Sequence, residues 1–246
     1  VGSEMCIRDR SNGGHASTPV KGTPIARLSA FVNEVETHSP FRKKMLPEVS
    51  AMFTALAPYA GFGMKLVFGN LWLFGPLLKA VMPSLSAQAG AMLKTTIAFT
   101  VQKGSDAYNV LPQEAYVGAN MRFIPHQGEK ESLEIIKKVA DKYGLETEVL
   151  HANDYTPPVD IHGEAFHLVE QTIADTFPGL PSSPYVMTGA TDAQFYQSIC
   201  KSCIRFAPVI YGPEQMKGMH GLNENIEYNC LPGAVRFYKN LIRAEK

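Results

Sequence analysis

Apolar residues recur at helical spacing in two segments of the first half of the chain, residues 24–36 and 131–143. The first helix is expected to begin at Thr23-Pro24, because threonine caps helix N-termini well and proline suits the first helical position. Gly144 follows the second segment, where a glycine commonly ends a helix. Each helix is expected to pack its apolar face against a core.

Three further segments alternate between apolar and polar residues, which is typical of half-buried strands. They are residues 95–103, 114–124 and 145–151. The apolar face of the first is expected to hold Ile97, Phe99 and Val101. The apolar face of the second is expected to hold Ala115, Val117, Ala119, Met121 and Phe123, and its opposite face Tyr116, Gly118, Asn120 and Arg122.

The order of these elements predicts the fold of the first half. With a strand remnant before the first helix, the order is strand, helix, strand, strand, helix, strand. This βαββαβ unit is typical of a ferredoxin-like α+β domain. We expect this domain to extend over residues 11–155.

Residues 38–93 interrupt that order and are expected to form short helices. Within them, Leu66–Leu78 contains no charge and holds the only tryptophan, Trp72. The run is shorter than the roughly 20 apolar residues of a membrane span, and glycines and a proline interrupt it. We interpret the insertion as an additional core layer. The alternatives are an apolar flap for an acyl chain, or a surface that contacts a membrane.

The second half, residues 156–246, predicts an α/β layer of alternating helices and strands. Helices are expected at residues 164–177, 192–200 and 233–243, and short strands at 185–187 and 204–207. Two strands are too few for a complete sheet. We therefore expect the chain to be a fragment that lacks an N-terminal part.

Composition excludes some classes of function. The formal net charge is zero, and no cluster of basic residues with interleaved aromatics is present, so nucleic acid is not expected as a partner. Cys200 and Cys203 form a CxxC pair without a second pair to complete a zinc knuckle, which favours buried thiols between a helix and a strand over a redox or metal role. So few cysteines leave the cellular compartment undecided.

Residues 1–10, VGSEMCIRDR, show neither helical nor strand periodicity. They resemble a translated sequencing adapter, and we expect them to contribute nothing to the fold.

Two histidine-containing stretches suggest chemistry. Gly13-Gly14-His15-Ala16-Ser17 places an imidazole among small residues. The stretch His220-Gly-Leu-Asn-Glu224 places a second imidazole near a carboxylate, a combination that suits a metal ligand and its supporting group. Taken alone, each stretch is more commonly an ordinary loop than a site.

Four stretches in order resemble the co-catalytic zinc exopeptidases of metallopeptidase family M20 (clan MH). They are Gly-Gly-His15-Ala-Ser, Asn109-Val-Leu-Pro, Gly-Ala-Thr191-Asp192-Ala and His220-Gly-Leu-Asn-Glu224. The insertion and the phrase Arg205-Phe-Ala-Pro are most similar to the carboxypeptidase S (Gly-Xaa carboxypeptidase) branch. The resemblance implies a dimerising lid domain over residues 11–155 and the C-terminal part of an α/β/α catalytic domain over 156–246.

The resemblance also implies roles for individual residues. His220 would be a zinc ligand supported by Glu224, and His15 would donate to the oxyanion in the active site of the partner subunit. Asn109 and Arg122 would hold the substrate. Thr191 and Asp192 would line the cleft, although Gln194 stands where the family usually has arginine.

The implied reaction is hydrolysis of the amide bond of N-acyl amino acids or short peptides with a free C-terminal carboxylate. Two zinc ions would activate the attacking water. A non-catalytic dimerisation or peptide-binding module and a small-acyl deacylase are the alternatives. Because one zinc ligand and no general base are found, we expect this chain alone to be inactive.

Overall fold

The computed structural model describes residues 2–85, 87–153, 155, 157–187, 189 and 191–245. The chain divides into two compact units. Unit 1 comprises residues 1–50, 70–157 and 186–190, and unit 2 comprises residues 51–69, 158–185 and 191–246.

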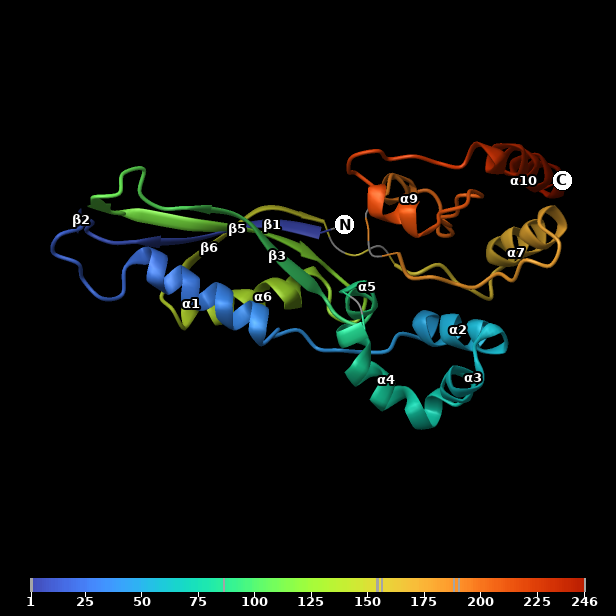
Figure 1. Ribbon diagram of the computed structural model, residues 1–246, viewed down its shortest axis with the longest axis horizontal. Coiled ribbons are helices and arrows are strands. Elements are labelled where there is room, and N and C mark those ends of the chain that lie inside the picture. The colour runs from blue at the N-terminus through green and yellow to red at the C-terminus, as the bar shows by residue number, and fades with distance from the viewer. Residues whose placement is uncertain are drawn as a thin grey trace. The chain divides into compact units, whose positions relative to one another are not determined.

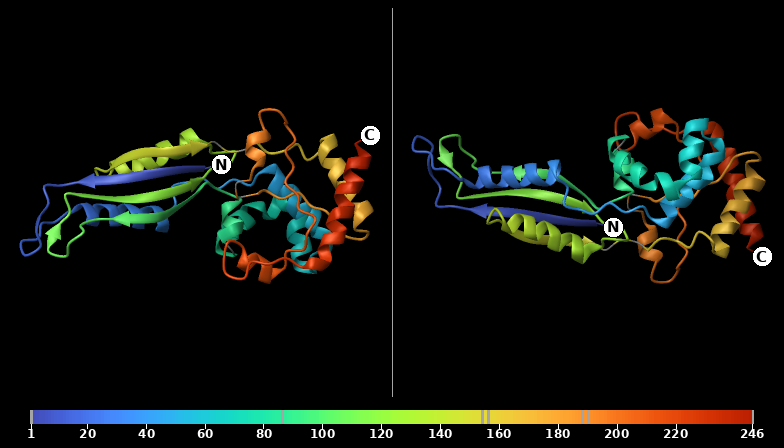
Figure 2. Two further views of the ribbon diagram at one scale, coloured as in Figure 1. Left: turned by 90° about the horizontal axis from the view of Figure 1, so that it is seen from above. Right: turned by 90° about the horizontal axis from the view of Figure 1, so that it is seen from below.

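Unit 1 is built on a four-stranded antiparallel sheet in the order β3-β5-β1-β6 (Figure 1). Its strands are β1 (Gly2–Arg10), β3 (Thr96–Lys103), β5 (Glu114–Arg122) and β6 (Glu146–Asn153). The helices α1 (Pro24–Thr37) and α6 (Glu129–Asp141) cover one face of this sheet (Figure 2). The chain order is βαββαβ, so the prediction of a ferredoxin-like α+β unit is confirmed.

The core of unit 1 lies between the two helices and the sheet. The predicted apolar face of β5 is buried, and α1 contributes Leu28, Phe31 and Val35 to the same cluster. Phe31 packs edge-on against Phe99, with ring centroids 5.7 Å apart. The predicted start of α1 is also confirmed, since the Thr23 side chain accepts a hydrogen bond from the Ala26 N–H.

Strand β1 corrects our expectation that residues 1–10 contribute nothing to the fold. Gly2–Arg10 pairs with both β5 and β6 and so lies inside the sheet, with Met5 and Ile7 buried in the core. The alternation was missed because Asp9 occupies an inward position, where Arg27 pairs with it, and Cys6 interrupts the polar face. The adapter origin of these residues remains a prediction.

The edge strand β3 differs from its predicted pattern at one residue. The register shifts between Phe99 and Val101, as in a β-bulge, so Val101 pairs with Gly118 and lies exposed instead of facing the core. A Cβ atom at Gly118 would lie 3.0 Å from the Val101 Cβ. The absence of a side chain at Gly118 therefore makes room for the side chain of Val101.

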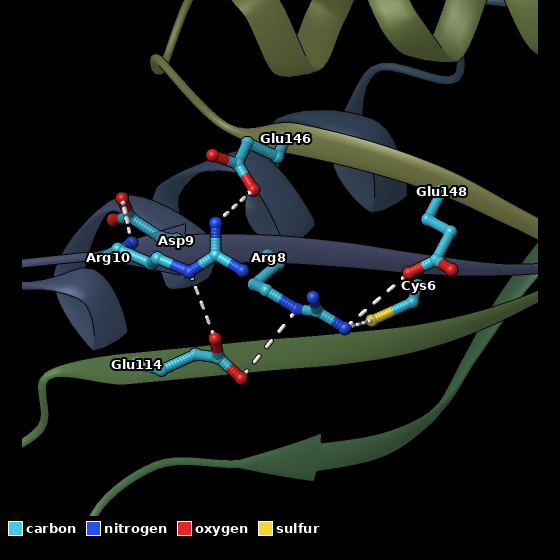
Figure 3. Close-up of polar contacts among 7 residues, drawn as sticks. All are labelled: Cys6, Arg8, Asp9, Arg10, Glu114, Glu146 and Glu148. Atoms are coloured by element: carbon cyan, nitrogen blue, oxygen red, sulfur yellow. Dashed lines mark hydrogen bonds and ion pairs between the residues drawn. The ribbon is translucent and has the colours of Figure 1, made fainter.

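The other face of the sheet carries a ladder of charges (Figure 3). Arg10 of β1 contacts Glu114 of β5 at 3.0 Å and Glu146 of β6 at 2.8 Å. Arg8 adds longer contacts to Glu114 and Glu148. Arg8 is half-buried and the other groups are exposed to solvent, so each of the two pairs of Arg10 stabilises the sheet by about 1 kcal/mol or less.

Hydrogen bonds from Lys142 and Tyr143, which follow α6, join this end of α6 to Glu34 of α1. Glu34 accepts hydrogen bonds from Lys142 Nζ at 2.7 Å and from Tyr143 OH at 2.6 Å. The Lys142 bond, with that of Tyr143, lowers the pKa of Glu34, and the same carboxylate raises the pKa of Tyr143.

The insertion forms short helices, as predicted. They are α2 (Pro47–Leu56), the 3₁₀ helix η1 (Ala57–Tyr59), α3 (Phe62–Gly69), α4 (Leu71–Leu85) and α5 (Ala87–Ala91). Among the described residues, no single helix is long and apolar enough to cross a membrane. Only α3 and α4 taken together, with a bend at the break between them, meet the criteria of length and composition.

Unit 2 contains α7 (Glu164–Thr176), α8 (Ala193–Tyr196), α9 (Pro213–Gly218), the 3₁₀ helix η2 (Tyr228–Cys230) and α10 (Leu231–Ala244). The first and last of these helices pack together. A Cβ atom at Gly233 would lie 2.9 Å from the Phe177 ring, and Asn240 donates a hydrogen bond to Thr176 Oγ1 at 3.0 Å.

Two strands predicted in the second half of the chain are wrong. Residues 185–187 and 204–207 are described and form no strand, and the helix expected over 192–200 is shortened to α8. Short apolar runs resemble strands locally, but a strand requires a paired neighbour, and none is present for these runs in the described part of the chain.

Candidate functional site

The first candidate site lies on a small β-ribbon in unit 1. Strand β2 (Gly14–His15) pairs antiparallel with β4 (Val110–Leu111), which lies in the loop before β5. The Ala16 N–H donates to the Asn109 carbonyl at 2.9 Å. The ribbon therefore brings together His15 and Asn109, two predicted site residues far apart in the sequence.

Glycine makes the tight approach of this ribbon feasible. Gly13 has a φ of +69°, and a Cβ atom there would lie 2.8 Å from Gln113 Cγ. Ser11 anchors the other end, since its N–H donates to the Gln113 carbonyl at 2.9 Å. Backbone hydrogen bonds at Ser11 and at Ala16 thus hold the segment that carries His15 on both sides of this histidine.

The hydrogen bonds of His15 select its tautomer. The Ser17 N–H donates to His15 Nδ1 at 3.2 Å, and Ser17 Oγ lies 2.7 Å from the same nitrogen. A backbone N–H can only donate, so in the neutral imidazole Nδ1 is the acceptor and the proton sits on Nε2. The exposed imidazole of His15 therefore presents an N–H donor, which is the form that can stabilise an oxyanion.

Arg122 does not join this ribbon within one copy of unit 1. It is the last residue of β5, paired with Thr96 of β3, and Gly2 of β1 lies beside its side chain. The nine residues of β5 span about 27 Å at roughly 3.4 Å per residue. Arg122 thus lies at the end of the sheet opposite to His15 and Asn109.

In unit 2, Thr191 and Asp192 precede α8. Thr191 Oγ1 accepts a hydrogen bond from Arg205 Nε at 3.1 Å, and Asp192 occupies the N-cap position of α8. Arg205, which was not predicted as a site residue, therefore holds this loop through its side chain. Thr188 and Ala190 of the same motif lie outside the described residues.

His220 and Glu224 lie on an exposed turn after α9. His220 has a φ of +58°, a left-handed conformation that is uncommon for residues other than glycine, and Asn223 has a φ of +59°. The Gly221 N–H donates to the Gly218 carbonyl at 2.8 Å, which closes the turn. Unusual backbone conformations are enriched at functional sites, so the geometry suits His220 as a site residue without assigning its role.

The described residues do not by themselves form a zinc centre. Zinc in proteins takes three or four side-chain ligands, and no group of three His, Cys, Asp or Glu side chains within reach of one ion is found among the residues described. His220 is therefore at most one ligand of a larger set.

The CxxC pair differs from its predicted setting. Cys200 is exposed and Cys203 half-buried, and both are free thiols. Burial raises the pKa of the Cys203 thiol, and its Sγ lies 3.2 Å from the Cys200 carbonyl oxygen. A thiol with a raised pKa is a poor nucleophile at neutral pH, so a catalytic role is not supported.

The chain belongs to peptidase family M20/M25/M40, whose sequence model matches residues 13–244. The predicted family membership is confirmed.

Among its relatives, the chain is 33% identical over 238 residues to the N-fatty-acyl-amino acid synthase/hydrolase PM20D1 of Xenopus tropicalis, covering 94% of this chain and 45% of the relative. It is 26% identical to the probable carboxypeptidase S-like 2 of Dictyostelium discoideum, covering 94% and 44%. The solved structure of the di-peptidase Dug1p from Saccharomyces cerevisiae matches with a TM-score of 0.62 at 14% identity, over 100% of this chain and 54% of Dug1p. The chain spans about half the length of the curated relatives it matches.

Proposed function

We propose that this chain supplies the lid and part of the catalytic domain of a zinc-dependent hydrolase. Its substrates would be N-acyl amino acids or short peptides with a free C-terminal carboxylate. The observation that carries the proposal is the His15 ribbon. An exposed imidazole held as the Nε2–H tautomer is a donor prepared for the oxyanion that forms when an amide is attacked.

The two ends of the sheet in unit 1 would serve different purposes. His15 and Asn109 at the ribbon would contact the reacting amide, and Arg122 at the opposite end would pair with a carboxylate through its planar guanidinium. With about 27 Å between them, estimated from the length of β5, these groups cannot contact one small substrate. This separation supports a two-fold dimer in which the ribbon serves the partner's site.

The remaining ligands of the metal would lie outside this chain. His220 would provide one nitrogen and Glu224 would orient that imidazole or its loop. Zinc, when bound by the whole protein, would supply an activated water. Thr191 and Asp192 would line the cleft, with Thr191 held by Arg205.

Activity measurements on a longer natural protein that contains this chain test the proposal. We expect His15→Ala and His220→Ala each to abolish most hydrolysis of N-acyl amino acids. Loss of one oxyanion donor lowers kcat about 100- to 1,000-fold. Mixing the two variants should restore part of the activity, because one composite site would then hold both histidines. Absence of any restoration would count against the ribbon acting in the partner's site.

The 246-residue chain alone should neither turn over these substrates with added zinc nor bind the ion tightly. Robust turnover by the purified chain would contradict this part of the proposal. If the longer protein has no activity while the chain still dimerises, a non-catalytic dimerisation or peptide-binding module is the better description.

The apolar insertion favours a long acyl group over a small one. The relative from Xenopus tropicalis is named for N-fatty-acyl amino acids, and residues 66–78 carry no charge. A longer protein that prefers acetyl or succinyl amino acids over long-chain ones would instead support the small-acyl deacylase.

A further inference from the structure

The apolar run that favours a long acyl group continues into α4, and the outer face of this helix is exposed in unit 1. Trp72 at the start of this helix is 81% exposed and Leu77 is 62% exposed. Leu73, Leu77 and Val81 follow one another at steps of four residues, so they form one stripe along the helix. The exposed positions of this stripe and its borders are Trp72, Leu73, Pro76, Leu77, Ala80, Val81 and Ser84.

The opposite side of α4 is apolar as well. Leu78 and Met82 are buried. A helix that is apolar on all sides is normally covered on all sides, by protein or by lipid. An interpretation of α4 as an additional core layer accounts for only its inner side.

The charged residues that flank α4 in the sequence are all basic over a long stretch. Between Glu48 and Asp106 the sequence contains four lysines and no acidic residue. Lys79 lies on α4 itself, at the border between the buried and exposed sides. Its long apolar stem can lie along a lipid surface while the ammonium stays at the headgroups.

A basic cluster lies next to the C-terminal part of α4. Gly90 of α5 lies close against Pro83 of α4, since a Cβ there would be 3.3 Å from the Pro83 backbone. The Lys44 N–H donates to the Leu93 carbonyl at 2.8 Å, which brings the Lys43-Lys44 segment to the end of α5. Neither of these two lysines forms an ion pair with a residue that the structure describes.

We propose that the exposed face of α4 docks onto an anionic lipid surface. An exposed tryptophan with leucines on one face, and lysines that form no ion pair with a described residue, is the combination by which interfacial helices bind acidic lipids. The apolar stripe inserts among the acyl chains, and Lys43, Lys44 and Lys79 face the lipid phosphates. This docking uses none of the proposed catalytic residues, although it shares Leu73 and Leu77 with the apolar run that favours a long acyl group.

Trp72 provides a direct measurement, because it is the only tryptophan of the chain. The purified chain is titrated with vesicles of phosphatidylcholine containing about 30% phosphatidylserine. We expect Trp72 emission to shift to shorter wavelength and brominated acyl chains to quench it. Vesicles of phosphatidylcholine alone, or salt raised from about 0.1 M to 1 M, should weaken the binding.

The double variant Leu73→Glu/Leu77→Glu tests the surface while it preserves the reporter. Both side chains are exposed, so the fold should tolerate the change, and a circular dichroism melt checks this. We expect the vesicle partition coefficient to fall about 10-fold or more, since two charges would enter the acyl region. The control is Val20→Glu/Tyr108→Glu, which replaces two other exposed apolar residues of unit 1 and should bind like the parent.

Three results would overturn the proposal. The first is the absence of binding to anionic vesicles, or binding that the α4 variant leaves unchanged. The second is concentration-dependent self-association without lipid that the α4 variant abolishes, which would show that a second copy covers the face. The third is a longer natural protein that contains α4 but does not bind the same vesicles.

Discussion

The ion pair that joins β1 to α1 allows a prediction whose size follows from the structure. Arg27 donates from Nε to Asp9 Oδ2 at 2.7 Å and from an η-nitrogen to Oδ1 at 3.0 Å. The Asp9 side chain is only 5% exposed, and that of Arg27 is 36% exposed. The change Arg27→Met removes the charge and both donors while it keeps most of the aliphatic contact.

Breaking a buried ion pair by removing one partner costs about 3–5 kcal/mol, because a buried charge is left without compensation. Here the cost should fall to about 2–3 kcal/mol, since Arg27 is partly exposed and the pair is therefore partly screened. Asp9 also keeps a hydrogen bond from the Arg10 N–H at 2.8 Å. At about 2–4 °C per kcal/mol for a chain of this size, the melting temperature of unit 1 should fall by about 4–12 °C.

The assay is a thermal melt followed by circular dichroism at neutral pH. The matched control is Arg10→Met, on the same strand, which removes two contacts to exposed carboxylates and should cost about 1 kcal/mol or less. The double variant Asp9→Leu/Arg27→Met should recover part of the loss, because no buried charge then remains. An Arg27→Met variant as stable as its Arg10→Met control would refute the reasoning.

Three further outcomes are expected. Ile7→Ala should cost about 2–5 kcal/mol in a chemical denaturation experiment, because Ile7 is fully buried in β1; a negligible cost would show that β1 does not form in solution. Glu34→Gln should reduce the dependence of the free energy of unfolding on pH at acid pH. The pKa of Glu34 is lowered in the folded state, so this carboxylate stabilises the fold above its unfolded pKa of about 4.3, and the stabilisation is lost as the pH falls through the folded pKa. Glu36→Gln on the same helix is the control. In long-range ¹H–¹⁵N spectra, the neutral imidazole of His15 should be the Nε2–H tautomer in the parent and a mixture of both tautomers in Ser17→Ala. A parent whose neutral imidazole carries its proton on Nδ1 would contradict the proposed role.

Local pattern was sufficient for the regular elements of unit 1. The helices that begin at Pro24 and end before Gly144 follow from spacing and caps, and β5 follows from strict alternation of apolar and polar residues. These properties are encoded within about ten neighbouring residues, which is the range over which periodicity is visible. The order of four short motifs was likewise sufficient for the family, which the match over residues 13–244 confirms.

Local pattern failed where distant residues decide the conformation. Residues 185–187 and 204–207 have strand-like composition but lack a paired neighbour in the described structure, so their backbone groups are not organised into a sheet. Conversely, β1 has an irregular pattern but gains two neighbouring strands. Whether a segment pairs in a sheet depends on long-range contacts, and the β-propensity of its residues changes the stability of that pairing only modestly.

The candidate site shows the same division. The sequence by itself identified His15, Asn109, Arg122 and His220 as separate candidates and predicted the strand that carries Arg122. Only the tertiary structure placed His15 beside Asn109 and Arg122 at the far end of β5. The physical reason is that antiparallel pairing joins β2 to β4 across about ninety intervening residues, and no short-range preference contains that information.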